Sequence, residues 1–356
     1  MNAPGTGASS SGAALEFLCV DEFLRTLVDA RALKTAFELA LVDHLVEHRS
    51  VGTDALGRAI GVDRTGLSLL LDLLGANHVV EERNGKVRLH PRFAAALRYR
   101  DLLETKLDFA GFTLNDFADL FTALVRNPGS GPPKGRLFEL FDYRRALDPT
   151  DENYQRTRSW MRLTSTLTRY EARACMQLHD FSPYRRMLDL GGNSGELILQ
   201  LCRRHSELHG TVLDLPLVCE IGMEHVLAQP EHPRITFLKA DIRDDVVPGG
   251  YDLMTFKSML HDWPEEDAER FLAKAARSLD PGGTLLIFER GPIRVGDSIP
   301  PFSMLPILLF FRSYRAPAFY TRKLEDLGFK DIECREVELD TPFFLVSARK
   351  PGAQPE

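Results

Sequence analysis

Residues 187–196 have the sequence Met-Leu-Asp-Leu-Gly-Gly-Asn-Ser-Gly-Glu, and this stretch decides the fold. A short, largely apolar run precedes three glycines, and a helical pattern begins at Leu197. Glycine tolerates positive φ angles and lets the backbone approach a ligand closely. A buried strand that turns through glycines into a helix is typical of a parallel α/β domain that binds a ligand at the turn.

The spacing of the glycines narrows the kind of ligand. Gly191, Gly192 and Gly195 match neither the G-x-G-x-x-G fingerprint of dinucleotide sites nor the P-loop, which also requires a Gly-Lys-Ser/Thr run. The loop therefore favours a nucleoside ligand without a pyrophosphate group.

Short β-like runs alternate with helical runs throughout the second half of the chain. This alternation predicts a parallel sheet, and the last two runs, joined by a short loop, predict an antiparallel hairpin at its edge. The expected strands are residues 187–190, 210–213, 235–238, 251–256, 284–288, 331–339 and 343–348.

Each of the first three expected strands carries an acid at or near its carboxyl end, namely Asp189, Asp214 and Asp241. An acid after the second strand is placed to bind ribose hydroxyls. An acid after the third, with the apolar Ile242 beside it, could meet an adenine ring. Any one of these acids could instead cap a helix or a turn. Together with the glycine loop they predict S-adenosylmethionine, a nucleoside without pyrophosphate, as the cofactor.

The fourth strand leads into Phe-Lys-Ser-Met-Leu-His-Asp-Trp, where His261 follows the strand's carboxyl edge. Open α/β sheets place their chemistry at that edge, and histidine suits general-base catalysis near neutral pH. Glu289 ends the fifth strand and is placed to bond the imidazole. His261 could instead be a loop histidine bonded to the backbone, and Glu289 an ion-pair partner near Arg290. Asp262 and Glu265 resemble a capping box for the next helix.

The first hundred residues have the pattern of a winged-helix module. Helices are expected over Leu15–Ala30, Ala32–Glu47, 53–60 and 64–74, followed by a hairpin over 79–89 that turns at Asn-Gly. The last of these helices carries leucines where a repressor carries base-reading side chains, which favours packing over DNA binding. The first two helices could cover a partner subunit or the chain's own core.

Composition sets the broad class. A chain of 356 residues with 44% hydrophobic residues and a net charge of −7 is expected to be a soluble two-domain enzyme, without nucleic acid as a partner. Five scattered cysteines without a C-x-x-C pair indicate reduced thiols, a cytoplasmic location and no zinc site. Residues 1–12 predict a disordered tail without an export signal. The apolar stretch 302–311 is too short to span a membrane.

These motifs, with Asp-Leu-Pro after the second strand and a closing Gly328-Phe329, resemble the small-molecule O-methyltransferases of plant caffeate and flavonoid metabolism and of bacterial antibiotic tailoring. The resemblance covers nearly the whole chain. It implies an α/β fold: a Rossmann-like class I methyltransferase domain with an antiparallel C-terminal hairpin, preceded by an all-α/winged-helix dimerisation domain. The expected limits are 1–12 for the tail, 13–100 for the dimerisation domain, 101–180 for a helical connector and 181–350 for the catalytic domain.

The family pattern implies roles for particular residues. The methionine end of the cofactor would lie at the glycine loop, the ribose at Asp214 and the adenine at Asp241. The implied cofactor-binding residues are Asp189, Gly191, Gly192, Gly195, Asp214, Leu215, Asp241, Ile242 and Lys257. His261 would be the general base and Glu289 its orienting partner, with no metal. Asn193 replaces a third consecutive glycine of many members, and residues 312–320 lack the second acid of many plant members.

The expected acceptor is an aromatic small molecule in a pocket lined by Trp160, Met161, Met304 and Leu308, although each of these could equally belong to the core or a dimer interface. The resemblance implies an O-methyltransferase of antibiotic-like metabolism that acts as a homodimer. Two alternatives are a C-methyltransferase on a phenolic acceptor and a cofactor-sensing winged-helix regulator.

Overall fold

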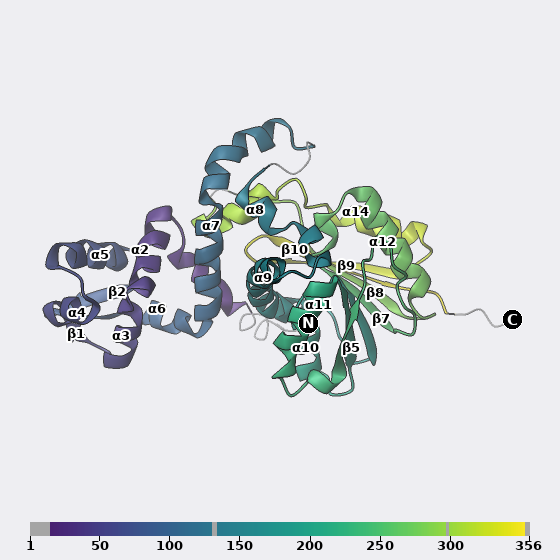
Figure 1. Ribbon diagram of the computed structural model, residues 1–356, viewed down its shortest axis with the longest axis horizontal. Helices are drawn as coiled ribbons and strands as arrows, with labels where there is room; N and C mark the ends of the chain where they lie inside the picture. Colours follow the sequence, from purple (N-terminus) through teal and green to yellow (C-terminus); the bar gives the residue numbers. More distant parts are fainter. Residues whose placement is uncertain (1–14, 130–133, 297–298, 353–356) are drawn as a thin grey trace, which may run out of the picture. The chain divides into compact units, whose positions relative to one another are not determined.

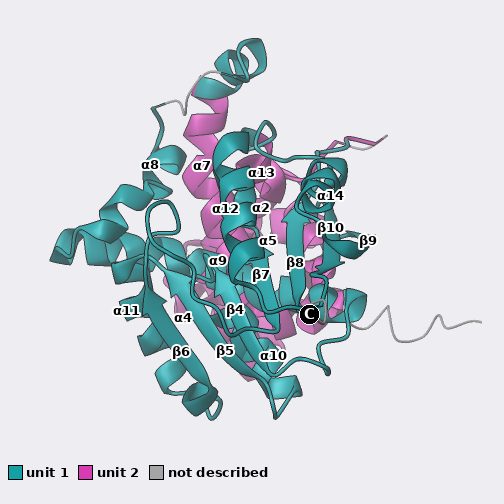
Figure 2. Cartoon of the chain, turned by 90° about the vertical axis from the view of Figure 1, so that its right-hand side faces the viewer, with its two compact units in different colours: residues 1–15, 120–294, 309–356 teal, residues 16–119, 295–308 magenta. Residues whose placement is uncertain are grey.

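The computed structural model describes residues 15–129, 134–296 and 299–352. The tail expected at residues 1–12 lies outside them. The chain forms two compact units, the first comprising residues 1–15, 120–294 and 309–356 and the second residues 16–119 and 295–308 (Figure 2).

A seven-stranded sheet in the order β6-β5-β4-β7-β8-β10-β9 forms the centre of the first unit. The five strands β4 to β8 run parallel, whereas β10 pairs antiparallel with both β8 and β9. All seven predicted strands are present within a few residues, and the C-terminal hairpin confirms the predicted fold class. The strands are β4 (Arg186–Leu190), β5 (His209–Asp214), β6 (Ile235–Lys239), β7 (Leu253–Lys257), β8 (Thr284–Arg290), β9 (Lys330–Glu338) and β10 (Pro342–Arg349).

Helices cover both faces of this sheet (Figure 1). Helices α9, α10 and α11 pack together on one face, and α12 and α14 cover the other. The helices of this unit are α8 (Arg136–Leu140), η3 (Tyr143–Leu147), α9 (Asp151–Leu178), α10 (Glu196–Arg204), α11 (Pro216–Leu227), η4 (His232–Arg234), η5 (Leu260–Asp262), α12 (Glu265–Ser278) and α14 (Pro317–Asp326).

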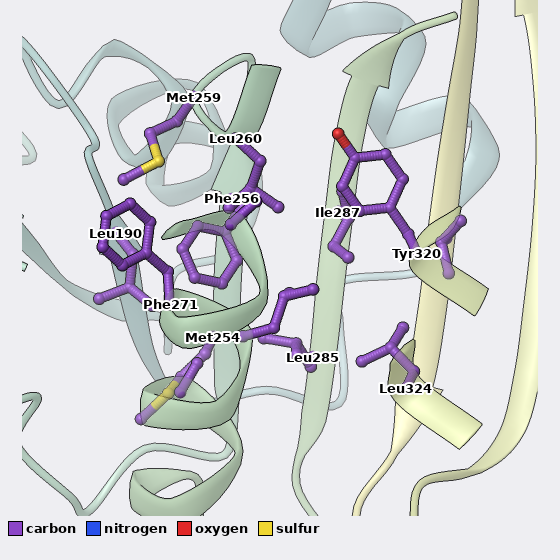
Figure 3. Close-up of a cluster of buried hydrophobic side chains, with 14 of the residues drawn as sticks. Leu190, Met254, Phe256, Met259, Leu260, Phe271, Leu285, Ile287, Tyr320 and Leu324 are labelled. Carbon is purple, nitrogen blue, oxygen red and sulfur yellow. The ribbon is translucent and has the colours of Figure 1, made fainter. Parts of the chain in front are cut away.

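A large hydrophobic core lies between the sheet and the helices α12 and α14 (Figure 3). Phe256 of β7 and Ile287 of β8 contribute to it from the sheet, and Phe271 of α12 does so from the helical layer. Met259 and Leu260 belong to the same cluster. The segment immediately before His261 is therefore anchored by packing.

The second unit contains the predicted winged-helix elements. Its small sheet has the order β1-β3-β2, and Asn84 and Gly85 both have positive φ at the hairpin turn, as an Asn-Gly turn requires. Its elements are η1 (Glu16–Phe23), α2 (Leu27–Glu38), α3 (Leu41–His48), β1 (Val51–Gly52), α4 (Thr53–Ile60), α5 (Arg64–Ala76), β2 (Val80–Arg83), β3 (Lys86–Leu89), α6 (Pro91–Ala96), η2 (Leu97–Tyr99) and η6 (Phe302–Met304). Helices α7 (Arg100–Arg126) and α13 (Leu305–Leu309) each cross a boundary between the units.

The first two predicted helices are wrong in their limits. The segment predicted as the helix Leu15–Ala30 is a 3-10 helix that ends at Phe23, and α2 begins only at Leu27 because Thr26 and Asp29 form a capping box there. The predicted helix Ala32–Glu47 is interrupted at Ala40, whose φ of 55° lies in the left-handed region. Apolar spacing alone did not reveal these two breaks.

Candidate active site

The site lies at the carboxyl edge of the parallel strands. The glycine loop follows β4, Asp214 ends β5, Asp241 lies just beyond β6, Lys257 ends β7 and Glu289 lies near the end of β8. Because these strands are parallel neighbours, their carboxyl ends meet at one edge of the sheet. The fold thus brings most of the predicted site residues to one place.

The glycine loop is sterically constrained. Gly191 has a φ of 70°, and a Cβ there would lie 2.5 Å from Cγ of Met259. A Cβ on Gly192 would lie 2.8 Å from Oδ2 of Asp189. Gly195 also has positive φ, at 74°, so all three predicted glycines occupy positions that favour glycine. Asn193 takes a φ of 53°, which asparagine tolerates better than most residues.

Asp189 lies beneath this loop and is 1% exposed. Its Oδ1 accepts a hydrogen bond of 2.5 Å from Oγ1 of Thr255 on β7. Burial raises the pKa of Asp189 to about 7, although Thr255 and Lys257 act in the opposite direction. The carboxyl group supports the loop from below.

Asp214 points at the loop from the end of β5. Its Oδ2 accepts a 2.8 Å hydrogen bond from the backbone N–H of Asn193, and its Oδ1 accepts one of 2.8 Å from the N–H of Leu215. Burial raises the pKa of Asp214 to about 6. Each carboxylate oxygen keeps a second lone pair, which is the arrangement that a pair of ribose hydroxyls requires.

The predicted adenine residues have partners of their own. Asp241 forms a forked ion pair with the Arg243 guanidinium, which lowers the pKa of Asp241. Ile242 is 6% exposed and belongs to the core cluster beneath the sheet edge. Leu215 packs against the cluster that contains Trp160.

Lys257 belongs to a buried chain of ion pairs. Its Nζ contacts Glu171 of α9 and donates a 2.9 Å hydrogen bond to Oγ1 of Thr168. The other oxygen of Glu171 accepts a 2.7 Å bond from Arg290, which also donates 2.8 Å bonds to Asp340 and Thr341 between β9 and β10. Glu171 was not predicted as a site residue, because Lys257 and Arg290 are distant from it in sequence.

His261 and Glu289 form the predicted pair. Nδ1 of His261 lies 2.5 Å from Oε2 of Glu289, whose Oε1 accepts 2.8 Å bonds from the N–H groups of Met259 and Leu260. Burial alone would raise the pKa of Glu289, but His261 and these donors lower it, so the carboxylate stays ionised and holds a proton on Nδ1. Nε2 is then the unprotonated nitrogen that can act as a base.

A second carboxylate lies on the other side of the imidazole. Oδ1 of Asp262 is 3.4 Å from Nε2 of His261, and Oδ2 accepts a 2.5 Å hydrogen bond from the phenol of Tyr143. The predicted capping box between Asp262 and Glu265 is wrong, because α12 begins after Pro264 without a side-chain cap. No sequence signal connected Tyr143 with a residue more than a hundred positions away.

The carboxylates of Glu289 and Asp262 both affect the pKa of His261. Burial alone would lower the pKa of His261, but Glu289 and Asp262 outweigh it and raise the pKa above its usual value. Residues 312–320, which lack the second acid of many plant enzymes, contact the segment around His261 through Arg315. Arg315 donates hydrogen bonds to the carbonyls of Leu260 and Trp263, on either side of the histidine.

Helix α9 contacts the glycine loop directly. Oγ of Ser165 donates to the carbonyl of Met161 and lies 2.6 Å from Oγ of Ser194, and Oγ1 of Thr164 lies 3.4 Å from Oδ1 of Asn193. These residues were not predicted, because serine and threonine inside a helix carry no distinctive signal.

The four predicted pocket residues fall in different units. Trp160 and Met161 of α9 lie in the first unit, in a cluster with Leu215 and α11. Met304 and Leu308 belong to the second unit. Their common role as an acceptor pocket stays a prediction.

The described part of the chain offers neither a metal-ligand cluster nor a membrane-spanning helix. Within residues 15–129, 134–296 and 299–352, no group of three or more histidine, cysteine, aspartate or glutamate side chains has the geometry to hold a metal ion. Across the same part of the chain, no helix combines the length and apolar character needed to cross a membrane.

Comparison with known proteins agrees with this geometry. Residues 140–298 match the family model of the O-methyltransferase domain. The 3-hydroxy-5-methyl-1-naphthoate 3-O-methyltransferase of Streptomyces sahachiroi is 36% identical over 185 residues, which are 50% of this chain and 51% of that relative. Demethylspheroidene O-methyltransferase of Rhodobacter capsulatus is 27% identical over 306 residues, or 83% of this chain and 73% of the relative. The chain thus matches about half the length of the first relative.

Solved structures share the fold. Human N-acetylserotonin methyltransferase in complex with S-adenosylmethionine has a TM-score of 0.71 and 20% identity, and the match covers 98% of this chain and 100% of that one. The fold is therefore that of the class I S-adenosylmethionine-dependent methyltransferases. Residues 140–298 are thus similar to an O-methyltransferase domain, and the human structure that shares the fold is a complex with S-adenosylmethionine.

Proposed function

We propose that this protein transfers a methyl group from S-adenosylmethionine to a hydroxyl of an aromatic small molecule, with His261 as the general base. The observation that carries the proposal is the position of His261 at the sheet edge, with its Nδ1 2.5 Å from Oε2 of the buried Glu289. The naphthoate acceptor named for the Streptomyces sahachiroi relative supports an aromatic acceptor.

The residues at the sheet edge fit the cofactor. Asp214 would accept hydrogen bonds from the ribose, and the glycine loop would lie against the methionine end, since Gly191 and Gly192 leave no room for side chains. Asp241 would meet the adenine amino group only with lone pairs that Arg243 leaves free. Ile242 and Lys257 would act through packing and through the ion pair with Glu171.

For methyl transfer from a sulfonium, the protein mainly has to position the acceptor oxygen against the methyl group and to remove the proton of the hydroxyl. When bound, S-adenosylmethionine supplies a methyl group on a positively charged sulfur. Nε2 of His261 would take the proton from the acceptor hydroxyl while that oxygen displaces the sulfur from the methyl carbon, so that the electron pair of the broken carbon–sulfur bond stays with S-adenosylhomocysteine as the leaving group. Glu289 and Asp262 stabilise the imidazolium that results.

The first test is calorimetric titration with S-adenosylmethionine and S-adenosylhomocysteine, with NAD as a control. Micromolar binding of the first two alone supports the cofactor assignment. A His261→Ala variant should keep that affinity and lose on the order of 100-fold in turnover of a phenolic acceptor. Equal turnover by parent and variant would remove His261 from the mechanism.

We further propose that the protein is a homodimer, that it acts in the cytoplasm in antibiotic-like metabolism, and that the second unit forms the dimer contact. The supporting observation is a set of exposed apolar side chains on that unit. They are Leu27, Val28, Val46 and Leu69, each more than 45% exposed.

A further inference from the structure

The indole N–H of Trp160 is a buried donor without a partner. Trp160 is 8% exposed, and its Nε1 is one of four buried side-chain nitrogen or oxygen atoms without a hydrogen-bond partner in the described part of the chain. Buried donors in folded proteins almost always have a hydrogen-bond partner, so the unpaired Nε1 of Trp160 calls for a functional explanation.

The surroundings of this indole belong to the site. Its ring lies edge-on to Tyr143, with centroids 5.4 Å apart, and Leu215 packs against the same cluster. Tyr143 in turn bonds Asp262 beside His261 and stacks on Trp263. Trp160 thus contacts Tyr143, which bonds Asp262 beside His261, and shares a hydrophobic cluster with Leu215, the residue that follows Asp214.

The chemistry of these neighbours limits what the indole could bind. Glu289 is fully buried, Asp214 and the side chain of Asp262 are half-buried, and the nearby Lys257 is already paired with Glu171. A carboxylate on the ligand would be repelled by these acids and would find no free cation among them. A single uncharged N–H donor among aromatic side chains is suited to bind a single uncharged oxygen acceptor.

We infer that Nε1 of Trp160 donates a hydrogen bond to a carbonyl oxygen of the acceptor. The acceptor would then be a hydroxyaryl ketone, quinone or amide, recognised at two points: the hydroxyl by His261 and the carbonyl by Trp160. This inference rests on the proposed function and adds the chemical class of the acceptor. Trp160 is a specificity-determining residue in this scheme.

The chain offers a built-in control, because Trp160 and Trp263 are its only two tryptophans. In a protein labelled with ¹⁵N at the indole nitrogens, Trp160→Phe and Trp263→Phe assign the two signals. S-adenosylhomocysteine is added first, and then 5-, 6- or 7-hydroxy-1-tetralone, which place the carbonyl at three positions relative to the hydroxyl. The matched probe without a carbonyl is 5,6,7,8-tetrahydro-1-naphthol for the 5-hydroxy ketone and 5,6,7,8-tetrahydro-2-naphthol for the 6- and 7-hydroxy ketones.

We expect at least one hydroxytetralone to move the Trp160 proton downfield, and the carbonyl-free probe to leave it in place. The same ketone should be methylated with a KM about tenfold below that of the carbonyl-free probe, the scale of one hydrogen bond. Trp160→Phe should abolish that difference while S-adenosylhomocysteine affinity stays unchanged.

Three results would overturn the inference. The Trp160 signal could move fully with S-adenosylhomocysteine alone, which would make the cofactor its partner. A second such result is a Trp160 signal that stays in place while a ketone is methylated. The third is a protein that binds S-adenosylhomocysteine but neither binds nor methylates any of the ketones. Loss of S-adenosylhomocysteine binding itself would contradict the proposed function instead.

Discussion

The His261 imidazole lies between two carboxylates that contact it at different distances and have different effects on it. Glu289 is fully buried, takes two backbone N–H bonds and contacts Nδ1 at 2.5 Å. Asp262 is 3.4 Å from Nε2 and is partly held by Tyr143. Glu289 fixes the tautomer of the imidazole, and Asp262 contributes mainly negative charge. Substitutions that affect the two carboxylates should therefore change the pH profile of turnover to different extents.

Replacing Glu289 with Gln should shift the profile to lower pH. Turnover needs neutral His261, so it rises as pH increases through the pKa of that residue. Since Glu289 raises this pKa, Glu289→Gln should move the rising limb of kcat to lower pH and reduce the plateau about tenfold or more, because the amide can also select the wrong tautomer. Kinetics from pH 5 to 9 check this, and an unmoved limb would contradict it.

Tyr143→Phe should have a milder effect in the same direction. The phenol lowers the pKa of Asp262, so its loss favours the neutral acid and weakens the charge beside Nε2. We expect the limb of kcat to move to lower pH while the affinity for S-adenosylhomocysteine stays constant. Tyr154→Phe, which loses the 2.7 Å bond from its phenol to Glu224 of α11, is the matched control. A profile identical in both variants would exclude this role for Tyr143.

Asp214 should make cofactor binding sensitive to acid. Its pKa in the free protein is about 6, and the ionised form is the one that accepts from two ribose hydroxyls. Affinity for S-adenosylhomocysteine should therefore fall as pH decreases below 6. In Asp214→Asn it should be weak and nearly independent of pH over the same range. Calorimetry at pH 5, 6 and 7.5 measures both, and a flat wild-type profile would refute the assignment.

At the scale of the element, the loop after β4 is the most constrained part of the site. Its glycines were predicted from the sequence because their spacing alone is informative. Helix α9 was predicted as a helix of nearly the correct length, but its contacts through Thr164, Ser165 and Glu171 were not. Those contacts depend on which face of the helix meets the sheet, and the partners of Glu171 are separated from it by more than eighty residues.

Gly191→Ala should destabilise the domain more than a glycine substitution with the same backbone strain elsewhere. A methyl group at Gly191 meets Met259 at 2.5 Å, whereas Gly282 has a similar φ of 78° and nothing within 4 Å. Both variants carry the strain of a positive φ, about 1–2 kcal/mol. Only Gly191→Ala should show the additional loss in Tm and weakened S-adenosylhomocysteine binding. Equal losses in Tm would mean that the loop accommodates the added methyl group at Gly191 without a further loss of stability.

At the scale of the whole molecule, the sequence predicted the fold class, the seven strands with their C-terminal hairpin and the winged-helix elements. The breaks at Thr26 and Ala40 were missed, because a capping box and a left-handed residue leave the apolar period unchanged. The pairing of Tyr143 with Asp262 was missed, because it joins a short 3-10 helix to a distant loop. Periodic patterns predict elements, but single long-range contacts need the folded chain.

The proposed homodimer is tested by light scattering during gel filtration. We expect a mass of about twice the 40.1 kDa of the chain. Leu69→Glu, on the exposed side of α5, should shift the protein toward the monomer, whereas Leu227→Glu, exposed on α11, should not. A monomeric wild type at micromolar concentration would contradict the proposal.

Helix α9 combines three tasks on successive turns: Trp160 and Met161 among the aromatic side chains, Thr164 and Ser165 against the glycine loop, and Glu171 in the ion-pair chain. Changes at the first two positions therefore need not disturb the others. An evolving lineage, or a designer with a library at positions 160 and 161, could exchange one acceptor for another while the machinery for methyl transfer is inherited intact.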